Sequence, residues 1–176
     1  MIIYNDEYCV IIDEVFDSKL VEKMNQAIEL SEKNGQLHED TSSNRSTMIK
    51  HPLFEKMSLL LCVDIQKCVD LYFDAKKIKP SYSFISSYKE GGVLDKHLDR
   101  EQCEFTASYS LFQTAPWAIY IEDNEYVLRE NQLILFKGRE HIHYRRDMPK
   151  GSRQCQVLFH YVYEDFNKDL YPSLKA

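Results

Sequence analysis

The sequence predicts a mainly β domain flanked by helices, and three features of the chain support this prediction. Before Pro80, apolar side chains recur at helical spacing, whereas after it apolar and polar side chains alternate with a period of two. The alternating segments are short and are separated by turn-forming pairs such as Gly91-Gly92. The 176 residues contain no linker, repeat or low-complexity segment. One domain is therefore expected, built as a sandwich, jelly roll or barrel with helices buttressing one face.

Two helices are predicted in the first part of the chain. The first is capped by Asp17 or Ser18, and its apolar positions follow helical spacing. The second spans residues 52–74, where Pro52 suits a first helical turn. The polar segment 36–50 between them is predicted to be a loop.

Strands are predicted after Pro80 from runs rich in β-branched and aromatic side chains. The chain then divides into a helical support region at 1–79, a β core at 80–163 and a C-terminal tail at 164–176. The predicted strands cover residues 81–88, 104–112, 117–122, 125–129, 132–136, 141–145 and 154–163.

Charge and cysteine usage narrow the class of protein. The net charge is −6 and the isoelectric point is near 5.5, which argues against nucleic acid or an anionic membrane as the main partner. The five cysteines are dispersed and odd in number, which favours reduced thiols in the cytoplasm. The first residues are acidic where a signal peptide is basic. The longest apolar run, residues 59–63, is too short to cross a bilayer.

Histidines in the strand-rich part are candidate metal ligands. His97 and Asp99 are two residues apart, so an extended chain places both on one side. A further histidine some forty residues later would complete two histidines and one carboxylate, a set that leaves three positions open on iron. His141 and His143 have the same strand parity, so alternation alone does not choose between them. His160 is expected to be a core histidine.

Arg153 is the candidate anion-binding residue. It follows a turn that contains Pro149 and Gly151, and a hairpin of that size would bring it beside the metal site. A buried guanidinium there would need an anionic partner, and a dicarboxylate could bind it in a bidentate manner. Without a metal site, Arg153 would be an ordinary solvated hairpin arginine.

Residues 82–162 resemble the double-stranded β-helix (cupin-like) core of the 2-oxoglutarate/Fe(II)-dependent oxygenase superfamily. The prolyl-4-hydroxylase-like branch, with its small bacterial and phage members, is the most similar. The order is Tyr, Gly, His-x-Asp, a Trp strand, Leu-Phe-x-Gly, His, Arg and a final Phe-His-Tyr strand. The stretches that carry the resemblance are YKEGGVLDKHLDREQCEF, PWAIYIEDNEYVLRENQLILFKGREHIHYRR and GSRQCQVLFHYV.

The resemblance implies a role for each matching position. His97, Asp99 and His143 would bind Fe(II), and Arg153 would bind the distal carboxylate of 2-oxoglutarate with help from the Tyr88 hydroxyl. Dioxygen would be the second cosubstrate. The enzyme would then hydroxylate a small molecule or a peptide residue and release succinate and CO₂.

Two choices within the site also follow from the resemblance. The family interval between the distal histidine and the arginine fits His143 and not His141, and the His-Tyr-Arg element at 143–145 agrees with it. Asp99 fills the position that is a small residue in related halogenases, so hydroxylation is implied. Position 155 carries Cys where many relatives have Ser or Thr, which puts part of the cosubstrate contact in question.

The surroundings of the site are less specific. The segments 36–50 and 89–96 are expected to face the substrate. Trp117 is expected in the core. Two other functions stay open: a cupin-like metalloprotein without 2-oxoglutarate chemistry, and a non-catalytic binding module. Polar residues that could line the pocket are Thr106, Ser108 and Ser110, and arginines available for anionic groups are Arg45, Arg100 and Arg139.

Overall fold

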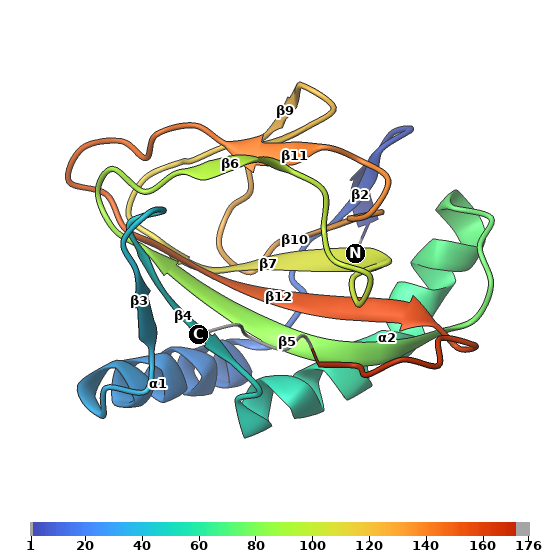
Figure 1. Cartoon of the computed structure of the whole chain (residues 1–176), viewed down its shortest axis with the longest axis horizontal. Helices are drawn as coiled ribbons and strands as arrows, with labels where there is room; N and C mark the ends of the chain where they lie inside the picture. The colour runs from blue at the N-terminus through green and yellow to red at the C-terminus, as the bar shows by residue number, and fades with distance from the viewer. Residues whose placement is uncertain (1, 172–176) are drawn as a thin grey trace.

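Two antiparallel sheets and two helices stack in layers in the computed structural model, which describes residues 2–171 (Figure 1). The smaller sheet lies above the larger sheet, and the helices lie against the opposite face of the larger sheet. The larger sheet has the order β1 (Ile2–Asn5), β2 (Cys9–Ile12), β10 (Leu133–Phe136), β7 (Phe105–Gln113), β12 (Gln154–Tyr163), β5 (Ile78–Tyr88), β4 (Arg45–Ile49) and β3 (His38–Asp40). The smaller sheet has the order β6 (Leu94–His97), β11 (His143–Arg145), β8 (Ile119–Ile121) and β9 (Asn124–Tyr126).

The two helices form where their spacing and caps predict. Helix α1 spans Ser18–Lys33, and the Asp17 carboxylate caps it by accepting a hydrogen bond from the Leu20 amide at 3.0 Å. Helix α2 spans Pro52–Tyr72 and begins with proline in its first turn. Neither helix among residues 2–171 is long and apolar enough to cross a membrane.

The main core fills the space between the helices and the larger sheet. Met24 of α1 and Phe54 of α2 are fully buried there against alternate residues of the central strands. Because strand side chains alternate, the intervening residues of the same strands face the smaller sheet. The core side of β7 and β12 carries Phe105, Ala107, Tyr109, Leu111, Cys155, Val157, Phe159 and Tyr161.

The segment 36–50 is a β-hairpin, so the prediction of a loop there is wrong. Strands β3 and β4 pair with each other, and β4 extends the larger sheet by pairing with β5. Strands β1 and β2 near the N-terminus were not predicted either, and β2 pairs with β10 inside the larger sheet. The N-terminal region thus supplies strands as well as helices.

Candidate metal centre

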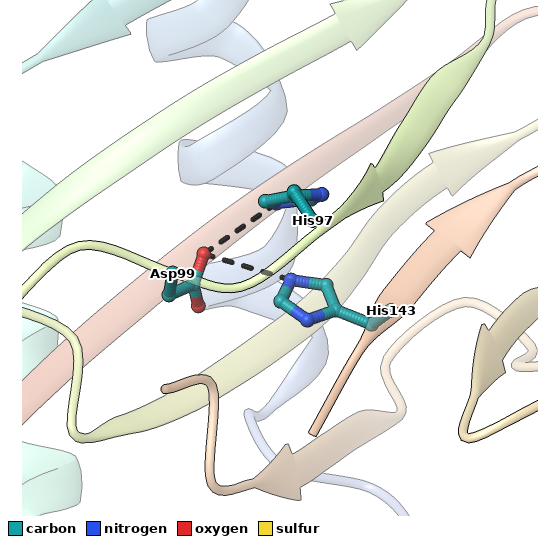
Figure 2. Close-up of side chains that lie close together, drawn as sticks. All are labelled: His97, Asp99 and His143. Atoms are coloured by element: carbon teal, nitrogen blue, oxygen red, sulfur yellow. Dashed lines mark ion pairs between the residues drawn. The ribbon is translucent and has the colours of Figure 1, made fainter. Parts of the chain in front are cut away.

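Backbone pairing brings three potential metal ligands together between the sheets. His97 ends β6, His143 begins β11, and the two residues are direct partners in the antiparallel pair. Asp99 follows two residues after His97 and turns its carboxylate toward both rings (Figure 2). The Asp99 Oδ1 atom lies 3.6 Å from His97 Nε2 and 3.5 Å from His143 Nε2. Ligands at right angles around a metal are about 3 Å apart, so small shifts suffice to bind one.

Both histidines are oriented with the same nitrogen free. The Nδ1 atom of His97 lies 2.8 Å from the Asp95 carbonyl oxygen, and that of His143 lies 3.0 Å from the His141 carbonyl oxygen. A carbonyl only accepts, so each Nδ1 carries a proton, and in the neutral ring Nε2 keeps its lone pair. A backbone partner of this kind orients a metal-binding histidine and fixes its tautomer. The two Nε2 atoms are the ones that face Asp99.

Asp99 is held by a second set of contacts. Its amide donates to the Gly138 carbonyl at 2.8 Å, and its Oδ2 accepts from Thr106 Oγ1 at 2.5 Å. The Thr106 hydroxyl also lies 3.1 Å from Nδ1 of the buried His160. These contacts occupy Oδ2 and leave Oδ1 for the histidine side of the cluster.

The electrostatics of the cluster favour a charged carboxylate. Burial alone would raise the pKa of Asp99, but contacts with His143 and His97 hold it well below its usual range. Burial likewise opposes protonation of His97, yet the same carboxylate raises the pKa of that ring. Burial lowers the pKa of His160 to about 4, so this histidine is neutral. An anionic oxygen and two imidazole nitrogens suit a divalent cation.

Gly138 leaves the space that Asp99 occupies. A Cβ atom at this position would collide with Asp99 Oδ2 and would lie 2.7 Å from Thr106 Oγ1. A side chain at 138 would therefore displace the carboxylate from the two histidines. The sequence signal for this constraint is the glycine that ends the stretch Leu135-Phe136-Lys137-Gly138.

The cluster opens into a cavity of about 330 Å³ between the two sheets. That volume is at the lower end of the range for small-molecule sites. Three arginines line it, Arg45, Arg100 and Arg145, together with Tyr88 and Ser108. The predicted pocket-facing position of Ser108 is therefore confirmed, whereas Thr106 contacts Asp99 instead.

Arg153 does not lie beside this cavity, so its predicted position is wrong. Its side chain is 57% exposed and lies 3.7 Å from Glu32 of α1, on the helix side of the larger sheet. It has the parity of Cys155 and Val157, which face the helices, so the interval counted from His143 reaches the wrong face. Cys155 consequently has no part in the cavity.

Arg145 is the arginine that faces the cavity from inside the fold. It is 2% exposed, it follows His143 by two residues on β11, and its strand alternation therefore places it on the same side. Its Nη1 donates to the Trp117 carbonyl at 2.8 Å, and the Gln156 amide, when turned with its oxygen toward the guanidinium, accepts from Nε at 3.3 Å. Burial lowers its pKa to about 10, a shift that nearby Tyr88 opposes.

The remaining predicted residues are placed as follows. Trp117 is buried in a small cluster with Tyr88 and Met148, as expected of a core residue. His141 lies outside the ligand cluster, because its Nδ1 is 3.8 Å from Glu122 and its ring packs edge-on against Tyr8. Strand parity made His141 and His143 equivalent, and the register with β6 separates them.

No protein-family model matches the sequence, and no curated protein matches it. Solved structures do match. HygX from Streptomyces hygroscopicus, with nickel, 2-oxoglutarate and hygromycin B bound, is 13% identical with a TM-score of 0.68, covering 90% of this chain and 84% of that one. A Pseudomonas putida prolyl-4-hydroxylase is 12% identical with a TM-score of 0.69, covering 89% and 93%.

A third match is the non-haem α-ketoglutarate-dependent epimerase SnoN from nogalamycin biosynthesis. It is 10% identical with a TM-score of 0.68, over 88% of this chain and 77% of that one. Identity this low establishes shared architecture only. The chain thus has the double-stranded β-helix fold of the 2-oxoglutarate/Fe(II) oxygenases, prolyl-4-hydroxylases included, with a candidate His-Asp-His metal triad in its central cavity.

Proposed function

We propose that this protein is an Fe(II)- and 2-oxoglutarate-dependent dioxygenase that hydroxylates an organic substrate. In this proposal His97, Asp99 and His143 hold the iron. Arg145 takes the role first predicted for Arg153 and binds the distal carboxylate of 2-oxoglutarate, with the Tyr88 hydroxyl beside it. When bound, the iron and its cosubstrate supply the oxidising chemistry and release succinate and CO₂.

This proposal rests mainly on one observation, the burial of Arg145 without a carboxylate partner in the described part of the chain. Arg145 is a buried cation, and within residues 2–171 no carboxylate lies within ion-pair distance of it. Its contacts are neutral, namely a carbonyl, an amide and the Trp117 ring at 4.8 Å. A buried unpaired charge is costly, so an anion that enters the cavity gains a strong partner. A dicarboxylate that reaches from the triad to Arg145 meets this requirement.

Each residue of the proposed site then has one role. The two Nε2 atoms and Asp99 Oδ1 would hold the metal, and all three residues line the cavity. Thr106 and the Gly138 carbonyl keep Asp99 in that orientation. Arg145 fixes the far end of the cosubstrate.

Hydroxylation is the outcome we propose, since Asp99 provides the third ligand and leaves no extra position for a halide. HygX binds hygromycin B and SnoN is an epimerase from nogalamycin biosynthesis, whereas the Pseudomonas putida protein is a prolyl-4-hydroxylase. For this chain we propose an amino acid, a peptidyl residue or a small metabolite as the substrate.

Succinate formation from 2-oxoglutarate tests the proposal. With Fe(II) and ascorbate, the wild-type protein should release succinate even without added substrate, at the slow rate of uncoupled turnover. Asp99→Ala should abolish this release and metal binding, because it removes the anionic ligand. His141→Ala is the matched control, since His141 lies outside the cluster and its loss should leave Fe(II) binding intact.

The alternatives give different results. A cupin-like metalloprotein would bind Fe(II) but would neither bind nor consume 2-oxoglutarate, and a non-catalytic module would bind without turnover. Loss of iron binding in His141→Ala with retention in His143→Ala would transfer the ligand role to His141. Wild-type activity in Asp99→Ala would contradict the triad.

A further inference from the structure

We propose that Arg45 is a positioning residue that turns the Tyr88 hydroxyl into a fixed hydrogen-bond donor for an anionic carboxylate held by Arg145. This inference rests on the proposed function and extends it to the N-terminal hairpin. It assigns a role to a part of the chain that lies outside the predicted β core.

Three residues form a row across the edge of the larger sheet. Asp40 of β3 is the direct partner of Arg45 in β4, and Arg45 is the direct partner of Tyr88 in β5. The side chains follow the same order. Asp40 Oδ2 lies 2.9 Å from Arg45 Nε, and Arg45 Nη1 lies 2.9 Å from the Tyr88 hydroxyl oxygen. Direct cross-strand partners are the closest side-chain neighbours in a sheet, so the register itself builds this row.

The direction of the second hydrogen bond follows from the chemistry of arginine. A guanidinium has donors and no acceptor, so the Tyr88 oxygen must accept from Arg45. The tyrosine proton therefore has to point elsewhere. Tyr88 is 2% exposed, and within residues 2–171 no atom accepts that proton. A buried hydroxyl proton without an acceptor can be satisfied by a ligand in the cavity that Tyr88 lines.

The position of Arg145 identifies the chemistry of that ligand. Tyr88 and Arg145 line the same cavity from opposite sheets, and Trp117 contacts both side chains. An anionic oxygen between them would accept one charge-assisted bond from Arg145 and one bond from Tyr88. A carboxylate meets both donors. In this row Asp40 orients Arg45, Arg45 orients Tyr88, and Tyr88 is the member that donates to the ligand.

Binding of 2-oxoglutarate to the Ni(II)-loaded protein tests this chain of contacts, because calorimetry then reads affinity without turnover. Tyr88→Phe should weaken binding on the order of tenfold, since it removes a hydrogen bond to a charged group. Arg45→Met should weaken it severalfold, since the hydroxyl loses its fixed direction. In the Tyr88→Phe background, Arg45→Met should change the dissociation constant by less than about twofold, because its effect passes through the hydroxyl.

Two controls separate positioning from other effects. Pyruvate lacks the distal carboxylate, so its affinity should not change in either variant. Arg129→Met removes an exposed arginine that pairs with Asp13 outside the cavity, and it should leave 2-oxoglutarate binding near wild type.

Equal effects of Arg45→Met in both backgrounds would overturn the proposal, since Arg45 would then act directly by its charge. Equal losses for pyruvate and 2-oxoglutarate would overturn it as well, because they would indicate general distortion. Failure of the wild-type protein to bind 2-oxoglutarate would instead overturn the proposed function, and this inference with it.

Discussion

The two faces of the larger sheet are both buried, but they differ in chemistry. On β7, the face toward the helices carries apolar side chains, and the face toward the smaller sheet carries hydroxyls. Ordinary core formation explains the first face. Buried polar groups cost free energy unless they find partners, so the hydroxyls of the second face need hydrogen-bond partners within the site. The two sets are Phe105, Ala107, Tyr109 and Leu111 on the helix face, and Thr106, Ser108 and Ser110 on the cavity face.

The hydrogen-bond contacts of the residues on the cavity face support this interpretation. Thr106 holds Asp99, Gln156 accepts from Arg145, and His160 contacts Thr106. Each of these residues connects to the metal cluster or to the cavity arginine. Changes on the cavity face should therefore alter ligand binding with little loss of stability, and changes on the helix face should do the reverse.

The largest effect is expected from Gly138→Ala. The added methyl group collides with the Asp99 carboxylate, so Fe(II) affinity should fall at least on the order of a hundredfold. Gly35→Ala is the control. Its φ of +64° disfavours a side chain but nothing lies within 4 Å, so it should cost only about 1 kcal/mol of stability and leave iron binding unchanged. Fe(II) titration and thermal denaturation measure the pair.

Smaller effects are expected from two substitutions on neighbouring strands, one on the cavity face of β7 and one on the helix face of β12. Thr106→Val keeps the volume but removes the hydrogen bond to Asp99, so Fe(II) affinity should fall about tenfold or more. Val157→Ala leaves a cavity in the helix-side core and should cost about 2 kcal/mol in the free energy of unfolding. The comparison breaks down if Val157→Ala weakens iron binding as much as Thr106→Val does.

The smallest effect concerns pH and His160. Its pKa is lowered from 6.5 to about 4 by burial, so the unfolded chain takes up the proton first as pH falls. The contribution of neutral His160 to the free energy of unfolding is fully present above about pH 6.5 and is lost as pH falls toward 4. Between pH 6.5 and 5.5 the loss is on the order of 1 kcal/mol. His97, whose pKa is raised, contributes in the opposite sense, so His160→Gln is the required reference. Denaturant unfolding of the metal-free proteins should show a weaker acid dependence in that variant.

The spacing of apolar residues and the capping residues predicted the two helices. Helices α1 and α2 follow from apolar spacing with Asp17 and Pro52 at their starts. The β3–β4 hairpin escaped prediction because its strands are short and mostly polar, and they join the larger sheet through the pairing of β4 with β5. Edge strands of this kind have little hydrophobic periodicity to detect.

For the site as well, spacing along the sequence predicted only part of the arrangement. The His97, Asp99 and His143 cluster follows from spacing and resemblance, and its closure depends on the β6–β11 register. The error over Arg153 arose because a residue interval says nothing about which face of β12 a side chain takes. Arg145 shares the parity of His143, so strand alternation could have identified it.

The most direct test compares the two arginines in one binding measurement. Calorimetric titration of 2-oxoglutarate into the Ni(II)-loaded protein should show at least about a hundredfold weaker binding for Arg145→Gln, because a buried charge pair is lost. Arg153→Gln should bind within about twofold of wild type, since its side chain lies 57% exposed beside α1. Normal affinity in Arg145→Gln, with loss in Arg153→Gln, would contradict the assignment of the cavity as the cosubstrate site.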